Sequence, residues 1–300
     1  MQRLIRILDD PYYALGRWML RNHPTLMSDK WYLKVIWLKR MGYKLNLKTP
    51  VNFNEKLQWL KLYDHKSEYS IMVDKYRVKD FVADIIGEQY VIPTLAVWNS
   101  VEDINIDMLP NQFVLKCNHD SGSVVICRNK LTFDLNRAKE KLKNAFNRNY
   151  YWSAREWPYK SVKPVVFAEK YIEDSDSDAL VDYKWFNFNG KPKFMYISRD
   201  RGRNPRTNFY DMDFNLLPFR MVDPNSEQVI SKPLKFEEMK YLASKLSEKL
   251  PMVRTDFYMV DGKVYFGEFT FYHNGGYFTL TPPEWNRIIG EWLTLPPRTK

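Results

Sequence analysis

The stretch VRTDFYMVDGKVYFGEFTF, residues 253–271, decides the fold of this 300-residue chain. Apolar and polar residues alternate on both sides of Asp261-Gly262, a pattern typical of two antiparallel strands joined by a tight turn. Strand-like runs also occur upstream, in FVLKCNHDSGSVVIC, PVVFAEKYIE and DYKWFNFNGKPKFMYIS. Charged helical patterns separate these runs. The sequence therefore predicts a mixed α/β (α+β) fold with prominent antiparallel sheets.

Four residues of this hairpin carry the chemistry of a candidate site. Arg254 and Asp256 share one face of the first strand, and Glu268 and Thr270 share one face of the second. Carboxylates at opposed strand positions have their side-chain bases roughly 5 Å apart and can share Mg²⁺, which prefers oxygen ligands. An arginine beside them can neutralise charge on a transferred phosphoryl group. An ordinary cross-strand salt bridge is the alternative interpretation.

The turn decides whether the two faces coincide. A two-residue turn would place Asp256 opposite Gly267 and leave Glu268 on the other side of the sheet. We expect a three-residue turn with Gly262 in the left-handed conformation, which pairs Arg254 with Glu268. All four side chains then point the same way.

Composition restricts the class of protein. The chain has 46 Lys plus Arg against 36 Asp plus Glu, a net charge of +10 and a pI near 9.3, and its size predicts a substantial core. Cys117 and Cys127 form neither a disulfide framework nor a zinc motif, which favours a reducing cytoplasm. No apolar run is long enough to span a bilayer, and no nucleic-acid-binding motif accompanies the positive charge.

Two further runs are candidate nucleotide-binding segments. Lys116 ends a predicted strand, and Gly122 lies between Ser121 and Ser123 in the turn that follows, where exposed N–H groups can hold phosphate. A plain hairpin turn is the alternative, and no Walker or GxGxxG motif is present. The second run is AEKYI, where backbone groups at a strand end can meet an adenine edge; it contains Glu169, Lys170, Tyr171 and Ile172.

These motifs occur in a defined chain order: Lys75 in VDKYRVK, Lys116 in LKCNHDSGS, then AEKYI, Asp182 in DYKWF, and finally Arg254-x-Asp256 with Glu268-x-Thr270. In this order they resemble the ATP-grasp ligases, and more closely the TupA-like branch associated with teichuronopeptide and capsular polysaccharide clusters. The resemblance covers most of the chain from about residue 50. FNEKLQWLKLYD, LKCNHDSGS and GKVYFGEFTF are its most specific stretches.

The resemblance implies ATP and Mg²⁺ as cofactors and assigns a role to each motif. Lys75 and Lys116 would hold phosphates under the flexible 120–123 turn. The residues implied for the rest of the nucleotide are Glu169, Lys170, Tyr171, Ile172, Asp182 near the ribose, and Lys184. The metal would be bound by Asp256, Glu268 and Thr270, although the family pattern usually has Asn where this chain has Thr270. Arg254, Lys116 and His273 are the implied catalytic residues.

The same resemblance implies a reaction and a division of the chain. A carboxylate would attack the γ-phosphorus of ATP to give an acyl phosphate, and an amine would then displace phosphate to leave an amide. His119 and His273 are candidates for the base, with a structural role as the alternative for each. We expect a helical N-terminal region over 1–70 and an ATP-grasp domain over 71–300, with a lid subdomain inserted at about 110–170 and a metal-binding sheet over 171–300.

The expected substrates are an amino acid or other amine and a uronic-acid-containing glycan or nucleotide sugar. SRDRGRNPRT contributes Arg199, Arg201, Arg203 and Arg206, which suit carboxylates or phosphates, with a solvated basic loop as the alternative. A metal-dependent glycosyltransferase with a site at Asp211-Met212-Asp213 is the rival function. A silent carbohydrate-binding scaffold is a third.

We expect a cytoplasmic protein, either free or attached to the inner face of the membrane. The first residues, MQRLIRILDD, place Leu4, Ile5 and Leu8 at helical spacing beside Arg3 and Arg6. Such a helix can rest on an anionic membrane surface. Packing of this helix on its own domain is the alternative.

Overall fold

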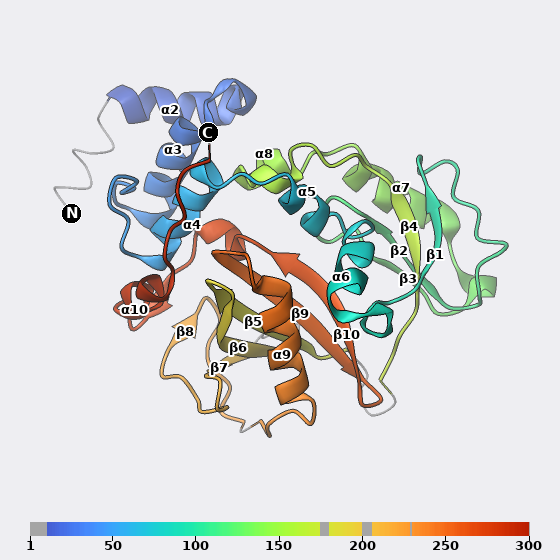
Figure 1. Ribbon diagram of the computed structural model, residues 1–300. Coiled ribbons are helices and arrows are strands. Elements are labelled where there is room, and N and C mark those ends of the chain that lie inside the picture. Colours follow the sequence, from blue (N-terminus) through green and yellow to red (C-terminus); the bar gives the residue numbers. More distant parts are fainter. Residues whose placement is uncertain (1–10, 175–179, 200–205, 229, 300) are drawn as a thin grey trace.

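The structure is a computed structural model that describes residues 11–174, 180–199, 206–228 and 230–299 (Figure 1). Its helices are α2 (Pro11–Asn22), α3 (Asp29–Met41), α4 (Phe53–Tyr63), α5 (Glu68–Val73), α6 (Val78–Ile86), α7 (Leu135–Phe146), α8 (Tyr151–Ala154), α9 (Phe236–Ser247) and α10 (Trp285–Trp292). Its strands are β1 (Thr94–Trp98), β2 (Phe113–Cys117), β3 (Val125–Cys127), β4 (Val166–Lys170), β5 (Asp182–Phe188), β6 (Lys191–Arg199), β7 (Arg206–Tyr210), β8 (Arg220–Met221), β9 (Met252–Val260), β10 (Lys263–Thr270) and β11 (Leu280–Thr281).

Two antiparallel sheets form the main body of the molecule. The smaller has the strand order β1-β4-β2-β3 and packs against α7 through its own buried cluster, which includes Phe113, Leu115 and Leu142. The larger has the order β10-β9-β5-β6-β7 and carries α9 on one face. Figure 1 shows α6 between the two sheets. The predicted mixed α/β fold with antiparallel sheets is confirmed.

The N-terminal helices belong to the core of the larger sheet. Phe53 and Leu57 of α4 are fully buried, and the Phe53 ring packs on Phe188 of β5 and on Phe278. Helix α10 packs on α4, so the end of the chain returns to the N-terminal helices. The N-terminal region is therefore part of the scaffold that supports the larger sheet.

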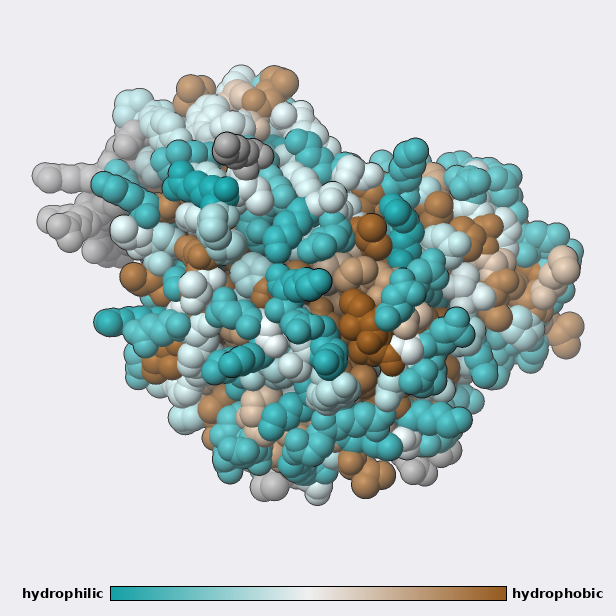
Figure 2. Space-filling view, in the orientation of Figure 1, coloured by the Kyte–Doolittle hydropathy of each residue, from teal (hydrophilic) through white to brown (hydrophobic). Residues whose placement is uncertain are grey.

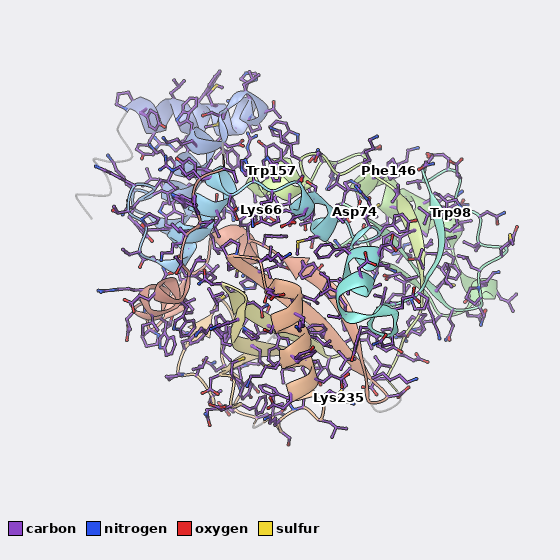
Figure 3. The ribbon with its side chains drawn as sticks, in the orientation of Figure 1. Lys66, Asp74, Trp98, Phe146, Trp157 and Lys235 are labelled. Carbon is purple, nitrogen blue, oxygen red and sulfur yellow. The ribbon has the colours of Figure 1, made fainter. Side chains whose placement is uncertain are left out.

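A buried polar contact ties the smaller sheet to the helices. Asp74, between α5 and α6, accepts hydrogen bonds from Asn118 Nδ2 at 2.9 Å and from the backbone N–H groups of Tyr76 at 3.0 Å and Arg77 at 3.1 Å. Figure 3 shows Asp74 where these helices approach the smaller sheet. Asn118 directly follows β2, so this contact fixes the turn after β2 relative to α6.

The hairpin of β9 and β10 departs from the predicted register. Val260 pairs with Lys263, and both Asp261 (φ 47°) and Gly262 (φ 72°) have positive φ, so the turn has two residues and the predicted three-residue turn is wrong. A β-bulge between Phe266 and Glu268 then inserts one extra residue, and Glu268 pairs with Asp256. The two carboxylates share a face by this route, and Arg254 is opposite Thr270 instead of Glu268.

The surface is mostly hydrophilic in the view of Figure 2, with hydrophobic side chains gathered over α6, where Ile85 is exposed and Phe81 and Ile86 are partly buried. Within the described ranges, no helix combines the length and apolar character needed to cross a membrane. The predicted helix at residues 1–10 lies outside the described residues.

The Asn189-Gly190 turn gives a test of the fold. Gly190 has φ +77°, and a Cβ there would lie 2.6 Å from the Glu248 carbonyl oxygen, whereas Gly262 has φ +72° and open space around it. Gly262→Ala should lower the free energy of unfolding by about 1 kcal/mol through backbone strain. Gly190→Ala should lower the free energy of unfolding by about 1–3 kcal/mol more than Gly262→Ala does, because its methyl group overlaps the end of α9. Urea unfolding of both variants measures this; equal losses would contradict the packing of this turn on α9.

Candidate active site

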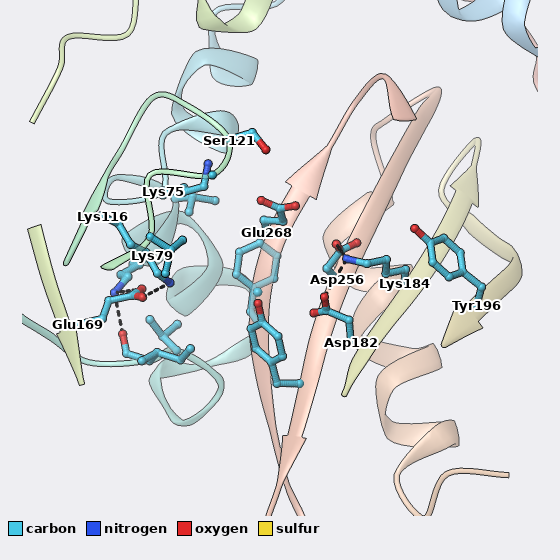
Figure 4. Close-up of a pocket in the computed structure, with 18 residues that line it drawn as sticks. Lys75, Lys79, Lys116, Ser121, Glu169, Asp182, Lys184, Tyr196, Asp256 and Glu268 are labelled. Carbon is cyan, nitrogen blue, oxygen red and sulfur yellow. Dashed lines mark hydrogen bonds and ion pairs between the residues drawn. The ribbon is translucent and has the colours of Figure 1, made fainter. Parts of the chain in front are cut away.

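A cavity of about 450 Å³ lies between the two sheets (Figure 4). Side chains of both sheets, of α6 and of the turn after β2 line it. Nine residues singled out from the sequence are among them: Lys75, Lys116, Ser121, Gly122, Glu169, Asp182, Lys184, Asp256 and Glu268. The structure thus brings together residues that are separated by up to 193 positions in the chain, since 268 − 75 = 193.

One wall of the cavity is positively charged. Glu169 accepts a hydrogen bond from Lys116 and forms an ion pair with Lys79 at 2.7 Å. Lys79 also donates to the Ile92 carbonyl at 2.8 Å. Burial opposes ionisation of Glu169, but the two ammonium groups outweigh it and lower the pKa of the carboxyl. With Lys75 included, three lysines face one carboxylate, a net charge of 3 − 1 = +2.

The turn after β2 is held by its own buried side chains. Ser123 Oγ accepts from the Cys117 N–H at 3.0 Å and donates to Asp120, so its hydroxyl is used inside the turn and does not line the cavity. Lys75 Nζ donates to the Asp120 carbonyl. Gly122 has φ +99° with nothing within 4 Å of its missing Cβ, a conformation that favours glycine. Exposed Ser121 and Gly122 therefore border the cavity with open backbone.

The facing wall is negatively charged and tightly connected. Arg254 binds Asp256 through two parallel hydrogen bonds, Nε to Oδ1 and Nη2 to Oδ2, both 2.7 Å. Lys184 donates to Asp256 and forms an ion pair with Asp182 at 3.2 Å. Burial alone would raise the pKa of Asp256, but Arg254 and Lys184 lower it to about 2. Asp256 is therefore ionised at neutral pH although it is 1% exposed.

Glu268 is the most accessible of these acids. Its side chain is 40% exposed, and its Oε1 lies 3.4 Å from Arg254 Nη2. Figure 4 shows the Glu268 carboxylate between Lys75 and Asp256, on the strand next to that of Asp256. Three carboxylates, Asp182, Asp256 and Glu268, against the cations Lys184 and Arg254 leave a net charge of 2 − 3 = −1 on this wall.

His273 lies behind Arg254 and does not line the cavity. Arg254 Nη1 is 2.6 Å from His273 Nδ1, which accepts this hydrogen bond as a neutral ring. Burial, together with the Arg254 charge, lowers the pKa of His273 well below its usual value. His119 is likewise buried, with its Nε2 2.9 Å from the Arg148 carbonyl. In this structure both histidines have structural partners.

The remaining predicted residues lie outside the cavity lining: Ser123, Lys170, Tyr171, Ile172, Arg254, Thr270 and His273. Lys170 is exposed at the end of β4, where its N–H donates to the Pro93 carbonyl at 2.9 Å. Thr270 pairs with Arg254 across the hairpin. The structure thus brings the cores of the predicted motifs together, but not all of their flanking residues.

Three polar residues of the lining were missed from the sequence. Lys79 follows Lys75 by four residues, and this helical spacing could have identified it. Tyr258 follows Asp256 by two residues on the same strand, so period-two alternation indicates that it shares the face of Asp256. Tyr196 is the cross-strand partner of Lys184, and no local pattern predicts that pairing.

The rival motif has a local structural role. Asp211 Oδ1 accepts from the N–H groups of Asp213 at 2.9 Å and Asn215 at 2.8 Å, so it caps a turn and lies away from the cavity. In the arginine-rich segment, Arg201 and Arg203 lie outside the described residues, as does the side chain of Arg199. Arg206 is exposed and donates to the Asn225 carbonyl at 3.3 Å.

The acidic wall fits a magnesium ion that arrives with a nucleotide. Among the described residues no group of three or more His, Cys, Asp or Glu has the arrangement of a complete metal site. Mg²⁺ commonly takes one or two protein carboxylates and completes its octahedron with phosphate and water. Asp256 and Glu268 are paired across β9 and β10 and both line the cavity, which matches that requirement.

The buried His273 ring gives a pH-dependent test. The unfolded chain protonates this histidine below about pH 6.5, and the folded chain does not, so the folded state loses stability as the pH falls. His273→Asn keeps an acceptor for Arg254 and removes the titration. Relative to the wild type, the variant should gain about 1.4 kcal/mol of unfolding free energy between about pH 7.5 and about pH 5.5. Chemical unfolding at several pH values measures this, and parallel curves would show that the ring titrates in the folded state as it does in the unfolded chain.

Comparison with known proteins gives one family and a set of similar folds. A search of curated proteins finds no significant match. Among solved structures, the chain is similar to D-alanine–D-alanine ligase from Bacillus anthracis complexed with ATP (19% identity, TM-score 0.39) and to that from Helicobacter pylori (15%, 0.41). It is also similar to the ATP-grasp ligase PsnB complexed with minimal precursor, Mg and ADP (12%, 0.41).

The three alignments cover 67%, 73% and 73% of this chain and 53%, 61% and 57% of those proteins. The chain thus spans little more than half the length of these structures. A model of the TupA-like ATP-grasp family matches residues 55–294, which include both sheets and every residue of the cavity lining. The chain therefore belongs to the TupA-like ATP-grasp family.

Proposed function

We propose that the protein is an ATP-dependent ligase that joins a carboxylate to an amine. The observation that supports this most strongly is the polarity of the cavity. A wall of Lys75, Lys79 and Lys116 faces a wall that carries Asp256 and Glu268. A triphosphate needs cations along its oxygens, and its metal ion needs carboxylates. One cavity offers both, on opposite sides.

We infer the following placement of the nucleotide. Lys75, Lys116 and the Ser121-Gly122 turn bind the phosphates, and Val78, Ile92 and Phe266 offer apolar contacts to the base. The residues that we assign to the rest of the nucleotide are Glu169, Lys170, Tyr171 and Ile172 for the adenine edge, with Asp182 and Lys184 towards the ribose. Glu169 also fixes the direction of Lys116 through their ion pair.

Asp256 and Glu268 would hold Mg²⁺, and Thr270 is the third ligand that we propose. When bound, the ion would supply positive charge between the phosphates and the acidic wall. Lys184 donates to Asp256 in this structure, so its ammonium group would have to leave that oxygen before the carboxylate could accept a metal. Arg254 keeps Asp256 ionised throughout.

The proposed reaction needs positioning and charge neutralisation. An oxygen of the substrate carboxylate attacks the γ-phosphorus, the bond to the bridging oxygen of ADP breaks, and an acyl phosphate forms. The amine then attacks the acyl carbon, loses a proton, and phosphate leaves. Lys116 and Arg254 are suited to stabilise the charge that develops on the transferred group. His273, neutral and behind Arg254, orients the guanidinium in this scheme.

We propose an amino acid and a uronic acid in cell-surface polysaccharide assembly as the substrates, and the cytoplasm as the location. This proposal follows from the family and from no contact in the cavity. A glycosyltransferase that uses a nucleotide sugar remains the alternative. Asp211 argues against that alternative, because both of its oxygens already accept hydrogen bonds within its own turn, from Asn215 among others.

The function is tested by Glu268→Gln. We expect this variant to fold like the wild type, since the side chain is 40% exposed, and to lose at least about a hundredfold in Mg²⁺-dependent ADP formation. The assay follows ADP by mass spectrometry during a screen of amino acids against uronic acids. Asp213→Asn, an acid outside the cavity, is the matched control and should retain activity. Loss of nucleotide-sugar turnover in Asp213→Asn, with no effect of Glu268→Gln, would favour the glycosyltransferase.

We further propose that the N-terminal region attaches the protein to an anionic membrane surface. Helix α2 packs on α3 through Gly16, whose Cβ would lie 2.4 Å from Val35, while Leu15 and Trp18 on α2 are each 54% exposed. Asp29 is the only acidic residue between positions 11 and 48. Exposed apolar side chains beside basic ones suit the interface of an anionic bilayer.

Cosedimentation with vesicles tests this attachment. The wild type should bind phosphatidylglycerol vesicles and not phosphatidylcholine vesicles, and Trp18→Ser should weaken binding several-fold, because the indole no longer enters the interface. Leu131→Ser removes an exposed apolar side chain elsewhere and should have no effect. Equal binding of all three proteins would contradict a role for α2.

A further inference from the structure

A second cavity, of about 280 Å³, lies on the other side of the turn after β2. Its walls come from that turn, from α7 with the residues that follow it, and from α8. Ser121 and Gly122 line both this cavity and the larger one. Because no atom lies within 4 Å of a Cβ built at Gly122, the boundary between the cavities is thin and free of side-chain packing at this residue.

The lining of the second cavity is basic. Lys141 and Arg148 contribute two cations, and Asp120 is the single acid in the lining. Lys141 Nζ donates to the Val124 carbonyl at 2.8 Å, which ties this ammonium group to the end of the turn. The Asp120 carboxylate accepts from Ser123 inside the turn. Arg148 is exposed, and among the described residues its guanidinium forms no ion pair with a carboxylate.

Tyr150 adds a phenol to this lining. It is half-buried, and burial raises the pKa of its phenol to about 12, with further contributions from the charges of Glu156, Glu268 and Asp120. The phenol is therefore a neutral hydrogen-bond donor at physiological pH, within electrostatic range of Glu268. A ligand beside Tyr150 would be separated by Ser121 and Gly122 from the larger cavity, which Glu268 lines.

We propose that the second cavity binds the acidic substrate, with Arg148 and Tyr150 contacting its negatively charged group. This inference rests on the proposed ligase function, which needs a carboxylate substrate next to the nucleotide. The planar guanidinium of arginine matches a carboxylate with two parallel hydrogen bonds. A protonated amine is disfavoured here by Lys141 and Arg148. The volume is near the lower limit of roughly 300 Å³ for small-molecule sites, which suits one sugar unit.

Two titrations on each protein test the proposal. The first measures the affinity for ADP with Mg²⁺ by calorimetry. The second measures the affinity for D-glucuronate and for D-galacturonate in the presence of Mg²⁺ and a non-hydrolysable ATP analogue. The variants are Arg148→Gln and Tyr150→Phe. The matched control is Lys143→Gln, which removes a cation from α7, the helix that Arg148 follows; Lys143 pairs with Glu102 at 2.7 Å, outside the cavity.

We expect a uronate to bind the wild type and Lys143→Gln with equal affinity. Arg148→Gln should weaken uronate binding by about tenfold or more, and Tyr150→Phe should weaken it several-fold. ADP affinity should be the same in all four proteins. Three results would overturn the assignment: uronate affinity unchanged in Arg148→Gln, ADP affinity reduced in Arg148→Gln, or ADP bound by the wild type and neither uronate bound. Binding of no probe at all by the wild type would overturn the proposed function as well.

Discussion

One extra residue in β10 determines which way Glu268 faces. With a two-residue turn and regular pairing, the period of two would send this carboxylate to the far side of the sheet, away from Asp256. The bulge at Gly267 restores the shared face. Glycine suits this position because a Cβ there would lie 3.2 Å from the Asp256 carbonyl and 3.1 Å from the Tyr258 ring. The acidic wall of the cavity depends on this local irregularity.

The charges of that wall depend on each other in turn. Asp256 is buried and would be costly as a lone carboxylate, so Arg254 and Lys184 occupy both of its oxygens. Arg254 is itself positioned by His273, which stays neutral because burial, and then the neighbouring guanidinium charge, disfavours its protonated form. The result is a prepared site with one net negative charge, opposite a wall with two net positive charges. In the proposed function, such a field would orient a metal–triphosphate complex.

The sequence predicted those parts of the site that follow from local periodicity. Alternation along residues 253–271 indicated that Arg254 and Asp256 share a face, and Lys116 with Ser121-Gly122 was identified from a strand followed by a small-residue turn. The mixed fold and the family followed from the order of these motifs. Each of these motifs is encoded within one short, contiguous segment.

The other features depend on contacts between distant segments. The predicted turn length was wrong because Asp261 and Gly262 can both adopt positive φ, which allows a two-residue turn as well as a three-residue one. The bulge at Gly267 leaves no periodic signal in the sequence. The position of His273 behind Arg254 is set by the turn after β10, where Asn274 (φ 48°) and Gly275 (φ 62°) have left-handed conformations. Tyr196 enters the cavity only through sheet pairing.

A crystal structure with ADP and Mg²⁺ tests the central claim most directly. We expect a metal ion between the carboxylates of Asp256 and Glu268, with Lys184 moved off Asp256, and phosphates that extend towards Lys116 and Gly122. A nucleotide bound elsewhere, or a metal ion with Glu268 turned to the opposite face of the sheet, would contradict it.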